Sequence, residues 1–170
     1  METSQQYTAR ILSNLGSQDA MKVLKTTPQK IKKIISGAKK KTLYQRPEPG
    51  KWSIAEIVAH LAETELVLGW RYRSAAEKNG VAIQPFDQDA WAANSRYQKS
   101  DVKVMLEMFS VIRAANLRFL AGLPKEKLKN VGLHQERGVE SILHIANLEA
   151  GHDLNHVKQI VKILKKQLRG

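Results

Sequence analysis

The sequence contains no cysteine in 170 residues, which excludes disulfide bridges, thiolate metal ligands and a cysteine nucleophile. It also lacks an apolar run near the roughly 18–20 residues that a membrane-spanning helix needs. Its first residues, METSQQYTARIL, show neither the basic start nor the apolar stretch of a secretory signal. Together these absences predict a cytoplasmic protein without a membrane span.

Acidic residues are few, since 16 Asp and Glu stand against 28 Lys and Arg and give a net charge of +12. Much of the excess lies in residues 22–46, which hold basic side chains and no acidic one. Such a cluster can attract nucleic acid, anionic lipid or an anionic small molecule, or can simply be a solvated surface. No nucleic-acid recognition motif and no interleaved aromatic residues accompany it, so the charge alone does not predict a nucleic-acid function.

The sequence is rich in helical periodicity. The apolar spacing predicts four long helices, over about residues 7–25, 53–78, 101–120 and 139–168, and a shorter helix between Pro28 and Gly37. No alternating pattern predicts a strand. A chain of 170 residues suffices for one core and is short for two. We therefore expect residues 1–170 to form a single all-α domain, an antiparallel four-helix bundle with long inter-helix connections.

The start of the second long helix is the most clearly defined. Ser53 is a suitable N-cap, and Glu56 occupies the third helical position, which together form a capping box. Trp52 before the cap and Ile57 after Glu56 are placed for a hydrophobic staple.

Two of the five histidines lie four positions apart in GHDLNH, residues 151–156. His152 and His156 are separated by about 40° around a helix, on the face that also carries apolar residues. His60 lies within about 60° of the apolar stripe of its own helix. Burying an imidazole without a partner costs about 1–3 kcal/mol, so each ring needs a hydrogen bond or a metal. Three inward histidines could hold one divalent ion and leave a coordination position open, as catalytic sites do.

Glu149 forms Glu-x-x-His with His152, the spacing found in di-iron bundles. A di-iron centre is not predicted, because the second long helix offers only the reverse order, His60-x-x-Glu63, and the first has no glutamate. Glu149 is instead a candidate catalytic residue acting as a general base, a fourth metal ligand, or an acceptor for an imidazole N–H. His134 and His144 are interpreted as structural or solvated.

Two segments carry a family resemblance. PGKWSIAEIVAHLAETE, residues 49–65, resembles the segment around the first metal-binding histidine of DinB-like proteins, and GHDLNHVKQI, residues 151–160, is similar to their C-terminal His-x-x-x-His signature. The resemblance implies a four-helix bundle, often dimeric, in which His60, His152 and His156 hold Zn²⁺ or Ni²⁺, with Fe²⁺ or Mn²⁺ as alternatives. Related branches include thiol S-transferases and thiol-dependent isomerases. The stretch FDQDAW resembles a loop of family members without an assigned activity.

Three neutral imidazoles leave the charge of a bound cation undiminished, so the ion strongly acidifies a water or a thiol. We therefore predict a divalent-metal-dependent enzyme, a thiol S-transferase or a hydrolase, whose partners are a small-molecule substrate such as a low-molecular-weight thiol and, by the resemblance, a second copy of the chain. The first alternative is a non-catalytic role in which the metal staples the bundle or serves as a sensor. The second is a basic nucleic-acid or membrane-surface binder.

Overall fold

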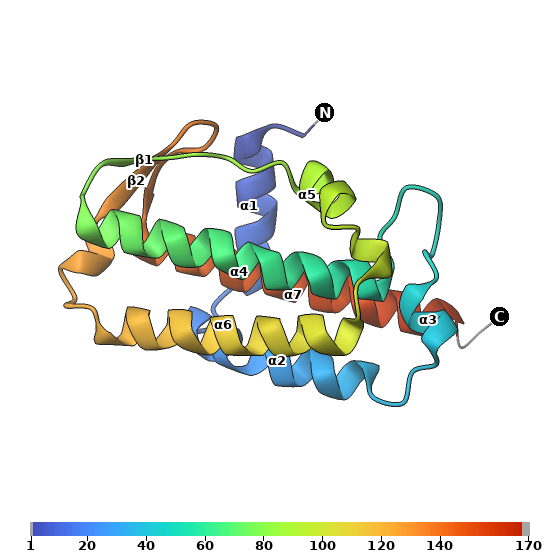
Figure 1. Cartoon of the computed structure of the whole chain (residues 1–170). Helices are drawn as coiled ribbons and strands as arrows, with labels where there is room; N and C mark the ends of the chain where they lie inside the picture. Colours follow the sequence, from blue (N-terminus) through green and yellow to red (C-terminus); the bar gives the residue numbers. More distant parts are fainter. Residues whose placement is uncertain (1, 168–170) are drawn as a thin grey trace.

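The computed structural model describes residues 2–167, and most of them are helical (Figure 1). The α-helices are α1 (Ser4–Leu15), α2 (Ala20–Ile35), α3 (Lys40–Tyr44), α4 (Ile54–Glu77), α5 (Gln88–Asn94), α6 (Val102–Gly122) and α7 (Ile142–Gln167). Short strands β1 (Val81–Ile83), β2 (Val131–His134) and β3 (Gly138–Ser141) and the 3-10 helices η1 (Tyr97–Lys99) and η2 (Lys127–Lys129) lie in the connections. Within this part of the chain, no helix is both long enough and apolar enough to cross a membrane.

The bundle is formed by α2, α4, α6 and α7, and α1 packs against α7 from outside it (Figure 1). The predicted four-helix bundle with long connections is therefore confirmed. Its helices do not all run antiparallel to their neighbours, however, because α4 and α6 share one direction and α2 and α7 share the other (Figure 1). This order requires a long return, and residues 78–101 pass back along the bundle between the end of α4 and the start of α6.

The N-terminal prediction of one helix over residues 7–25 is wrong. Helix α1 ends at Leu15, and Gly16 adopts a positive φ of 57° that breaks the helix. Helix α2 begins after Asp19, whose carboxylate accepts the backbone N–H of Lys22 at 2.7 Å. Pro28, expected at the start of a separate helix, lies inside α2. The apolar periodicity continues from α1 into α2, so it does not reveal the boundary between the two helices, which is set by the turn at residues 16–19.

A small sheet was not expected, and the structure corrects that expectation. Strand β1 pairs with β2 in parallel, and β2 pairs with β3 antiparallel. Strands of three and four residues are too short to establish an alternating pattern in the sequence. Because Gly138–Ser141 form β3, α7 begins at Ile142 rather than at the predicted Val139. The predicted end of this helix, Leu168, lies outside the described residues.

Helix α4 begins where the sequence predicts. The Ser53 hydroxyl accepts the N–H of Glu56 at 3.3 Å, and the Glu56 carboxylate accepts the N–H of Ser53 at 2.8 Å. Arg46 also binds the Glu56 carboxylate, which ties the preceding loop to the same cap. Helix α6 begins after Asp101, which accepts the N–H of Lys103 at 2.8 Å. The capping-box prediction is confirmed, and it fixes the first turn of the helix that carries His60.

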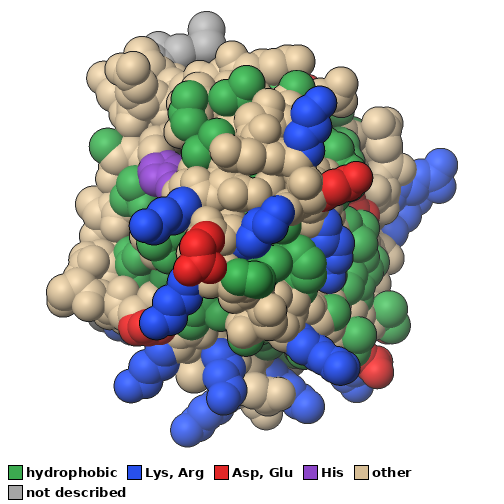
Figure 2. All heavy atoms as spheres, turned by 90° about the vertical axis from the view of Figure 1, so that its left-hand side faces the viewer, with side chains coloured by type: hydrophobic (Ala, Val, Ile, Leu, Met, Phe, Trp, Pro, Cys, Tyr) green, Lys and Arg blue, Asp and Glu red, His purple; other side chains and the backbone are tan. Residues whose placement is uncertain are grey.

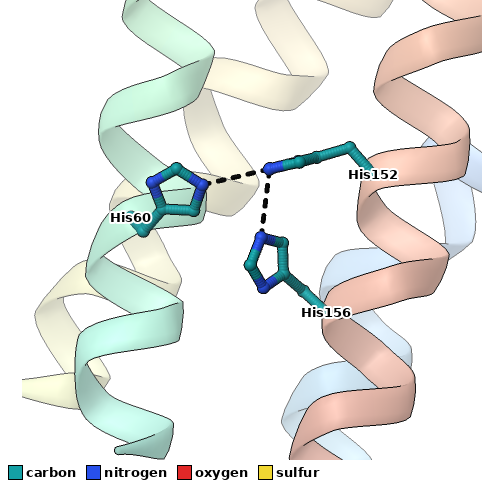
Figure 3. A group of neighbouring side chains, drawn as sticks. All are labelled: His60, His152 and His156. Carbon is teal, nitrogen blue, oxygen red and sulfur yellow. Dashed lines mark hydrogen bonds between the residues drawn. The ribbon is translucent and has the colours of Figure 1, made fainter. Parts of the chain in front are cut away.

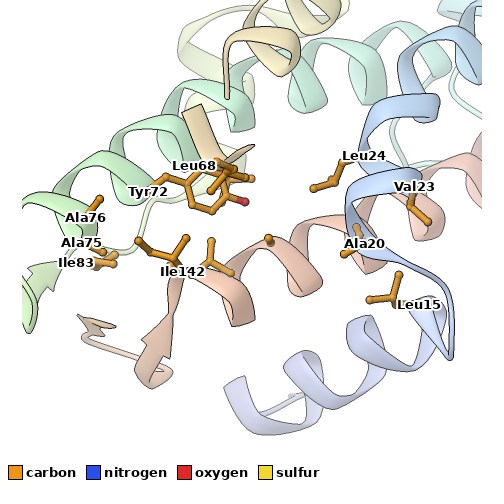
Figure 4. Packing of buried hydrophobic residues seen from close by; sticks show 14 residues of the cluster. Leu15, Ala20, Val23, Leu24, Leu68, Tyr72, Ala75, Ala76, Ile83 and Ile142 are labelled. Atoms are coloured by element: carbon orange, nitrogen blue, oxygen red, sulfur yellow. The ribbon is translucent and has the colours of Figure 1, made fainter. Parts of the chain in front are cut away.

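Buried apolar residues form two clusters within the bundle. One surrounds Leu68 and Tyr72 on α4 (Figure 4), and the other includes Ile57 on α4 and Phe109 on α6. All four bundle helices carry buried polar side chains where one cluster gives way to the other along the sequence, with Glu149 just before Ala150, the last α7 member of the first cluster; this polar layer consists of Thr27, Glu65, Arg113, Asn116, Glu149 and Asp153. The bundle therefore has a charged middle between two apolar ends.

Helix α1 approaches α7 closely at Gly151. A Cβ atom added to Gly151 would lie 2.2 Å from the carbonyl oxygen of Ile11, which is closer than atoms can pack. The glycine therefore lets the backbone of α1 lie directly against α7, next to His152.

We predict that Gly151→Ala lowers the free energy of unfolding by about 1–3 kcal/mol, because the new methyl group must displace the α1 backbone. Urea unfolding followed by circular dichroism measures the change. Gly122→Ala is the matched control, since a Cβ there meets no atom within 4 Å. Equal stability of the two variants would contradict the assigned contact between α1 and α7.

Candidate metal centre

Three imidazole rings meet in the space between α4 and α7 (Figure 3). The Nε2 atom of His152 lies 3.0 Å from Nε2 of His60 and 3.0 Å from Nε2 of His156. One nitrogen from each of the three rings lies within 4.8 Å of the other two. His60 and His156 are buried, whereas His152 is partly exposed. The structure thus brings together the three histidines that the sequence singled out.

The protonation of these rings suits a metal. Nδ1 of His156 lies 2.9 Å from Oε1 of Gln159, and because an amide oxygen only accepts, Nδ1 carries the proton and Nε2 offers its lone pair to the cluster. Burial, followed by the neighbouring imidazoles, lowers the pKa of all three histidines well below the usual value, so the rings are neutral. Neutral imidazole nitrogen is a preferred ligand of Zn²⁺ and related ions.

Hydrogen bonds alone do not satisfy this cluster. His152 Nε2 faces two other ring nitrogens but can donate at most one proton, and His60 Nδ1 is buried without a partner. The two 3.0 Å separations are also close to the ~3.3–3.4 Å between two nitrogens of one tetrahedral Zn²⁺, given Zn–N distances of about 2.0–2.1 Å. The three residues therefore fit a single divalent ion.

Two cavities open on the histidine cluster. The first, of about 400 Å³, is lined by His60 and His152 and extends along α4 to Arg71. The second, of about 460 Å³, is lined by His152 and His156. The basic residues that line the second cavity are Arg10, Lys51, Lys162 and Lys166. Both volumes suit a small molecule, which can reach the cluster from either side of His152.

Arg113 on α6 organises the polar layer beside the cluster. Its guanidinium donates to Glu65 on α4 at 2.6 Å and to Asp153 on α7 at 2.7 Å. It also lies 3.0 Å from Oε1 of Glu149 and donates to the carbonyl of Leu24 on α2 at 2.9 Å. One buried cation thus contacts each of the other bundle helices.

Glu149 lies one turn before His152 on α7 and lines the first cavity, but it is not part of the histidine cluster. Its buried carboxyl accepts the hydroxyl proton of Tyr72, and Oε1 has no hydrogen bond. Burial, with the nearby Glu65 carboxylate, raises the pKa of Glu149 well above its ordinary value. Its contacts are with Tyr72 and Arg113 rather than with an imidazole, so the geometry gives no support to the fourth-ligand and imidazole-acceptor roles, and the general-base role stays a prediction.

Glu63, His134 and His144 are not part of the histidine cluster. Glu63 accepts the hydroxyl proton of Tyr97 at 2.8 Å and so anchors η1. His134 is buried in β2, where its Nδ1 accepts backbone N–H groups, and the side chain of His144 is 36% exposed. The FDQDAW stretch includes the start of α5, which Asp87 caps, and it borders the site, because Phe86, Asp87 and Gln88 line the first cavity and Gln88 and Asp89 line the second.

The basic side chains of residues 22–46 are all exposed, and none of them lines either cavity at the cluster. Figure 2 shows the end of the bundle that carries β1 and β2, where Lys and Arg side chains alternate with apolar and uncharged groups. The basic segment is therefore a solvated surface of α2 and α3 that does not adjoin the histidines.

The sequence reasoning missed the polar layer. Arg113 and Asn116 continue the i, i+4, i+7 spacing of buried α6 residues that starts at Val102, and Glu65 lies among buried residues of α4. A charged residue at a core position of an amphipathic helix was the available signal, because such a charge needs buried partners.

The fold and the sequence of this chain are similar to those of known proteins. The chain is a helical bundle whose three inward histidines form a candidate metal centre. The model of the DinB superfamily matches residues 24–160, and the chain belongs to that family.

Individual relatives cover most of the chain. A protein of Bacillus cereus (strain 03BB102), named "Putative metal-dependent hydrolase", is 24% identical over 139 residues, which are 82% of this chain and 80% of the relative. A protein of Oceanobacillus iheyensis with a name of the same type is 19% identical over 92% of this chain and 90% of its own length. The structure of YfiT from Bacillus subtilis, described as a probable metal-dependent hydrolase with an unusual four-helix bundle topology, superposes with a TM-score of 0.82 at 18% identity and covers 97% of this chain and 89% of YfiT.

We predict that Arg113→Met destabilises the protein by about 3–5 kcal/mol, because it leaves buried carboxyls without their cation. Urea unfolding measures the loss. Arg118→Met, on the exposed side of the same helix, is the control for the removal of one positive charge. A loss below about 1 kcal/mol for Arg113→Met would refute the central role of this ion-pair network.

Proposed function

We propose that this protein, acting as one domain over residues 1–170, is a metal-dependent hydrolase of a small molecule, with His60, His152 and His156 as the ligands of one divalent ion. The observation that carries the proposal is the convergence of three Nε2 atoms beside a cavity of about 400 Å³. The names of the Bacillus cereus relative and of YfiT support it. The ligand set accepts Zn²⁺, Ni²⁺, Fe²⁺ or Mn²⁺.

A bound divalent ion supplies Lewis acidity, which polarises a substrate carbonyl and makes water or a thiol lose a proton at neutral pH. The chain supplies the orientation and the proton transfer. Gln159 holds the His156 ring through Nδ1, while the partial exposure of His152 leaves an approach for substrate. The Glu149 carboxyl in the first cavity, whose pKa is raised by burial, is the group we assign to donate a proton to the leaving group.

Thiol transfer is the second candidate, and the second cavity favours it. Of its basic residues, Arg10 and Lys166 are each paired with a glutamate. Lys51 and Lys162 are therefore the cations assigned to meet the carboxylates of an anionic low-molecular-weight thiol. The same Lewis acidity serves both reactions. Incubation with glutathione or bacillithiol and an electrophile such as 1-chloro-2,4-dinitrobenzene distinguishes thiol transfer from ester hydrolysis. The homodimer that the family resemblance implies stays a prediction, which analytical ultracentrifugation can test.

We predict about one divalent ion per chain in protein purified without a histidine tag, measured by elemental analysis. His60→Ala, His152→Ala and His156→Ala should each lose most of this metal, because two imidazoles hold an ion far less tightly than three. His144→Ala should retain it, since that side chain is partly exposed and lies outside the cluster. Full metal content in all three site variants would rule out the assigned ligands.

Chelation separates a catalytic metal from a structural one. In the enzyme, removing the ion abolishes hydrolysis of p-nitrophenyl acetate while the helical circular dichroism signal persists, and adding the ion back restores turnover. In the alternative of a metal staple or sensor, chelation lowers the melting temperature sharply and the loaded protein shows no reactivity towards esters or thiols.

Glu149→Gln should lower kcat for hydrolysis of an alkyl ester or an anilide, whose leaving group must take up a proton, by about 100-fold or more, the usual contribution of a proton-transfer group, with metal content unchanged. The amide keeps the shape of the side chain but cannot donate and take back a carboxyl proton. Glu63→Gln is the matched control, because Glu63 binds Tyr97 and is not part of the cluster. Retained kcat in Glu149→Gln would leave Glu149 with a structural role alone.

A further inference from the structure

The first cavity contains a buried cation that makes no direct ion pair within the described chain, although the carboxylates of Glu136 and Glu140 lie near enough to raise its pKa. Arg71 on α4 is 3% exposed and lines the cavity together with Phe86, whose ring centroid lies 6.0 Å from the guanidinium carbon. Among the described residues, no carboxylate lies within 4.0 Å of its nitrogens. Buried cations are usually paired, since an uncompensated charge in a protein interior is strongly unfavourable. Arg71 is therefore a candidate for binding an external anion.

The hydrogen bonds of Arg71 lead to the same conclusion. Nη2 donates to the carbonyl oxygen of Gln84 at 2.8 Å, whereas Nε is buried and has no partner. Nη2 also lies 3.3 Å from Nε2 of His134. Nδ1 of His134 accepts the backbone N–H groups of Glu136 and Arg137, so the proton of this neutral ring is on Nε2 and the contact with Arg71 joins two donors. The guanidinium therefore has N–H groups without a hydrogen-bond acceptor, and a bound ligand could supply one.

The rest of the cavity defines the shape of that ligand. Thr64 and Arg71 fall within about 40° of His60 around α4, and Arg71 follows His60 by about 16 Å along the helix axis. The Thr64 hydroxyl is also buried without a partner. Apolar side chains form part of the walls, namely Leu68, Pro85, Phe86, Ile145 and Leu148, and polar or charged side chains form the rest, including Glu2, Asp87, Glu136, Arg137 and Glu149. The cavity is therefore elongated, with an apolar stretch at Leu68 between the histidines at one end and Arg71 at the other.

We propose that this cavity binds an elongated small-molecule carboxylate, with its anionic head on Arg71 and its apolar body along Leu68. Its reacting group then lies beside His60 and His152, and only this last placement rests on the proposed hydrolase function. A monoanionic carboxylate matches one uncompensated charge better than a phosphate dianion, because Arg137 is already paired with Glu140 at 2.6 Å. Burial and the nearby Arg137 lower the pKa of Arg71 to about 10, so the guanidinium remains charged at neutral pH.

Isothermal titration calorimetry with metal-free protein tests the proposal. Octanoate should bind at least about tenfold more tightly than acetate, because acetate has no alkyl chain to contact the apolar walls. Octanoate should also bind at least about tenfold more tightly than octanamide, which has the same alkyl chain but no charge. Arg71→Gln should abolish the preference for octanoate over octanamide. Arg118→Gln, which removes an exposed arginine from α6, should leave the preference intact.

Equal binding of octanoate and octanamide to the unmodified protein would overturn the proposal, and that comparison decides even if Arg71→Gln does not fold. A preference that persists in folded Arg71→Gln would also overturn it. Tighter binding of octyl phosphate than of octanoate would contradict the carboxylate class.

The failure of this proposal is distinguishable from that of the proposed function. His156→Ala should keep the octanoate preference, because Arg71 is not part of the histidine cluster. Loss of the preference in a folded His156→Ala variant would count against the assigned head-group contact. Octanoate preference without metal uptake would refute the proposed function alone, whereas metal uptake without the preference would refute the carboxylate site alone.

Discussion

The ion-pair network of Arg113 fixes the arrangement of the bundle. A buried guanidinium has five donors in one plane, and here it meets carboxylates on α4 and α7 and a backbone carbonyl on α2. The carbonyl belongs to Leu24, four residues before Pro28, and a proline has no N–H to donate to it. The proline inside α2 therefore leaves an acceptor for Arg113, and the four helices are joined at one level by charge rather than by apolar packing alone.

This level is also the level of the histidines. Glu149 and Asp153 flank His152 on α7, and Glu65 follows His60 by little more than one turn of α4. Ion pairs to these carboxyls restrain α7 and α4 against sliding, which sets the 3.0 Å separation between His60 and His152. The capping box of α4 fixes its start, and the close contact at Gly151 holds α1 over α7. The cluster therefore depends on contacts that do not involve the histidines themselves.

The sequence predicted the histidine cluster because helical spacing places each histidine relative to an apolar stripe, and the capping box at Ser53 defines where α4 begins. The prediction from the sequence failed where a few residues determine the boundary or the type of an element. The turn before Asp19 splits what the periodicity presents as one helix, and the strands are too short to alternate. The parallel order of α4 and α6 depends on a long connection whose path no local pattern encodes. Arg71 and Arg113 were missed because an arginine adds nothing to the apolar periodicity, even where its position on the helix is buried.

The proposed site has distinct parts: three histidines as the ligand set for a metal, the Glu149 carboxyl for proton transfer, and Arg71 at the far end of the first cavity. The most direct test of the account is anomalous X-ray diffraction from crystals of the metal-loaded protein, which locates the ion and its ligands. The account predicts one ion between α4 and α7, with the Nε2 atoms of His60, His152 and His156 at about 2.0–2.2 Å. An ion bound elsewhere, or histidines that keep their mutual hydrogen bonds in the presence of saturating metal, would contradict it.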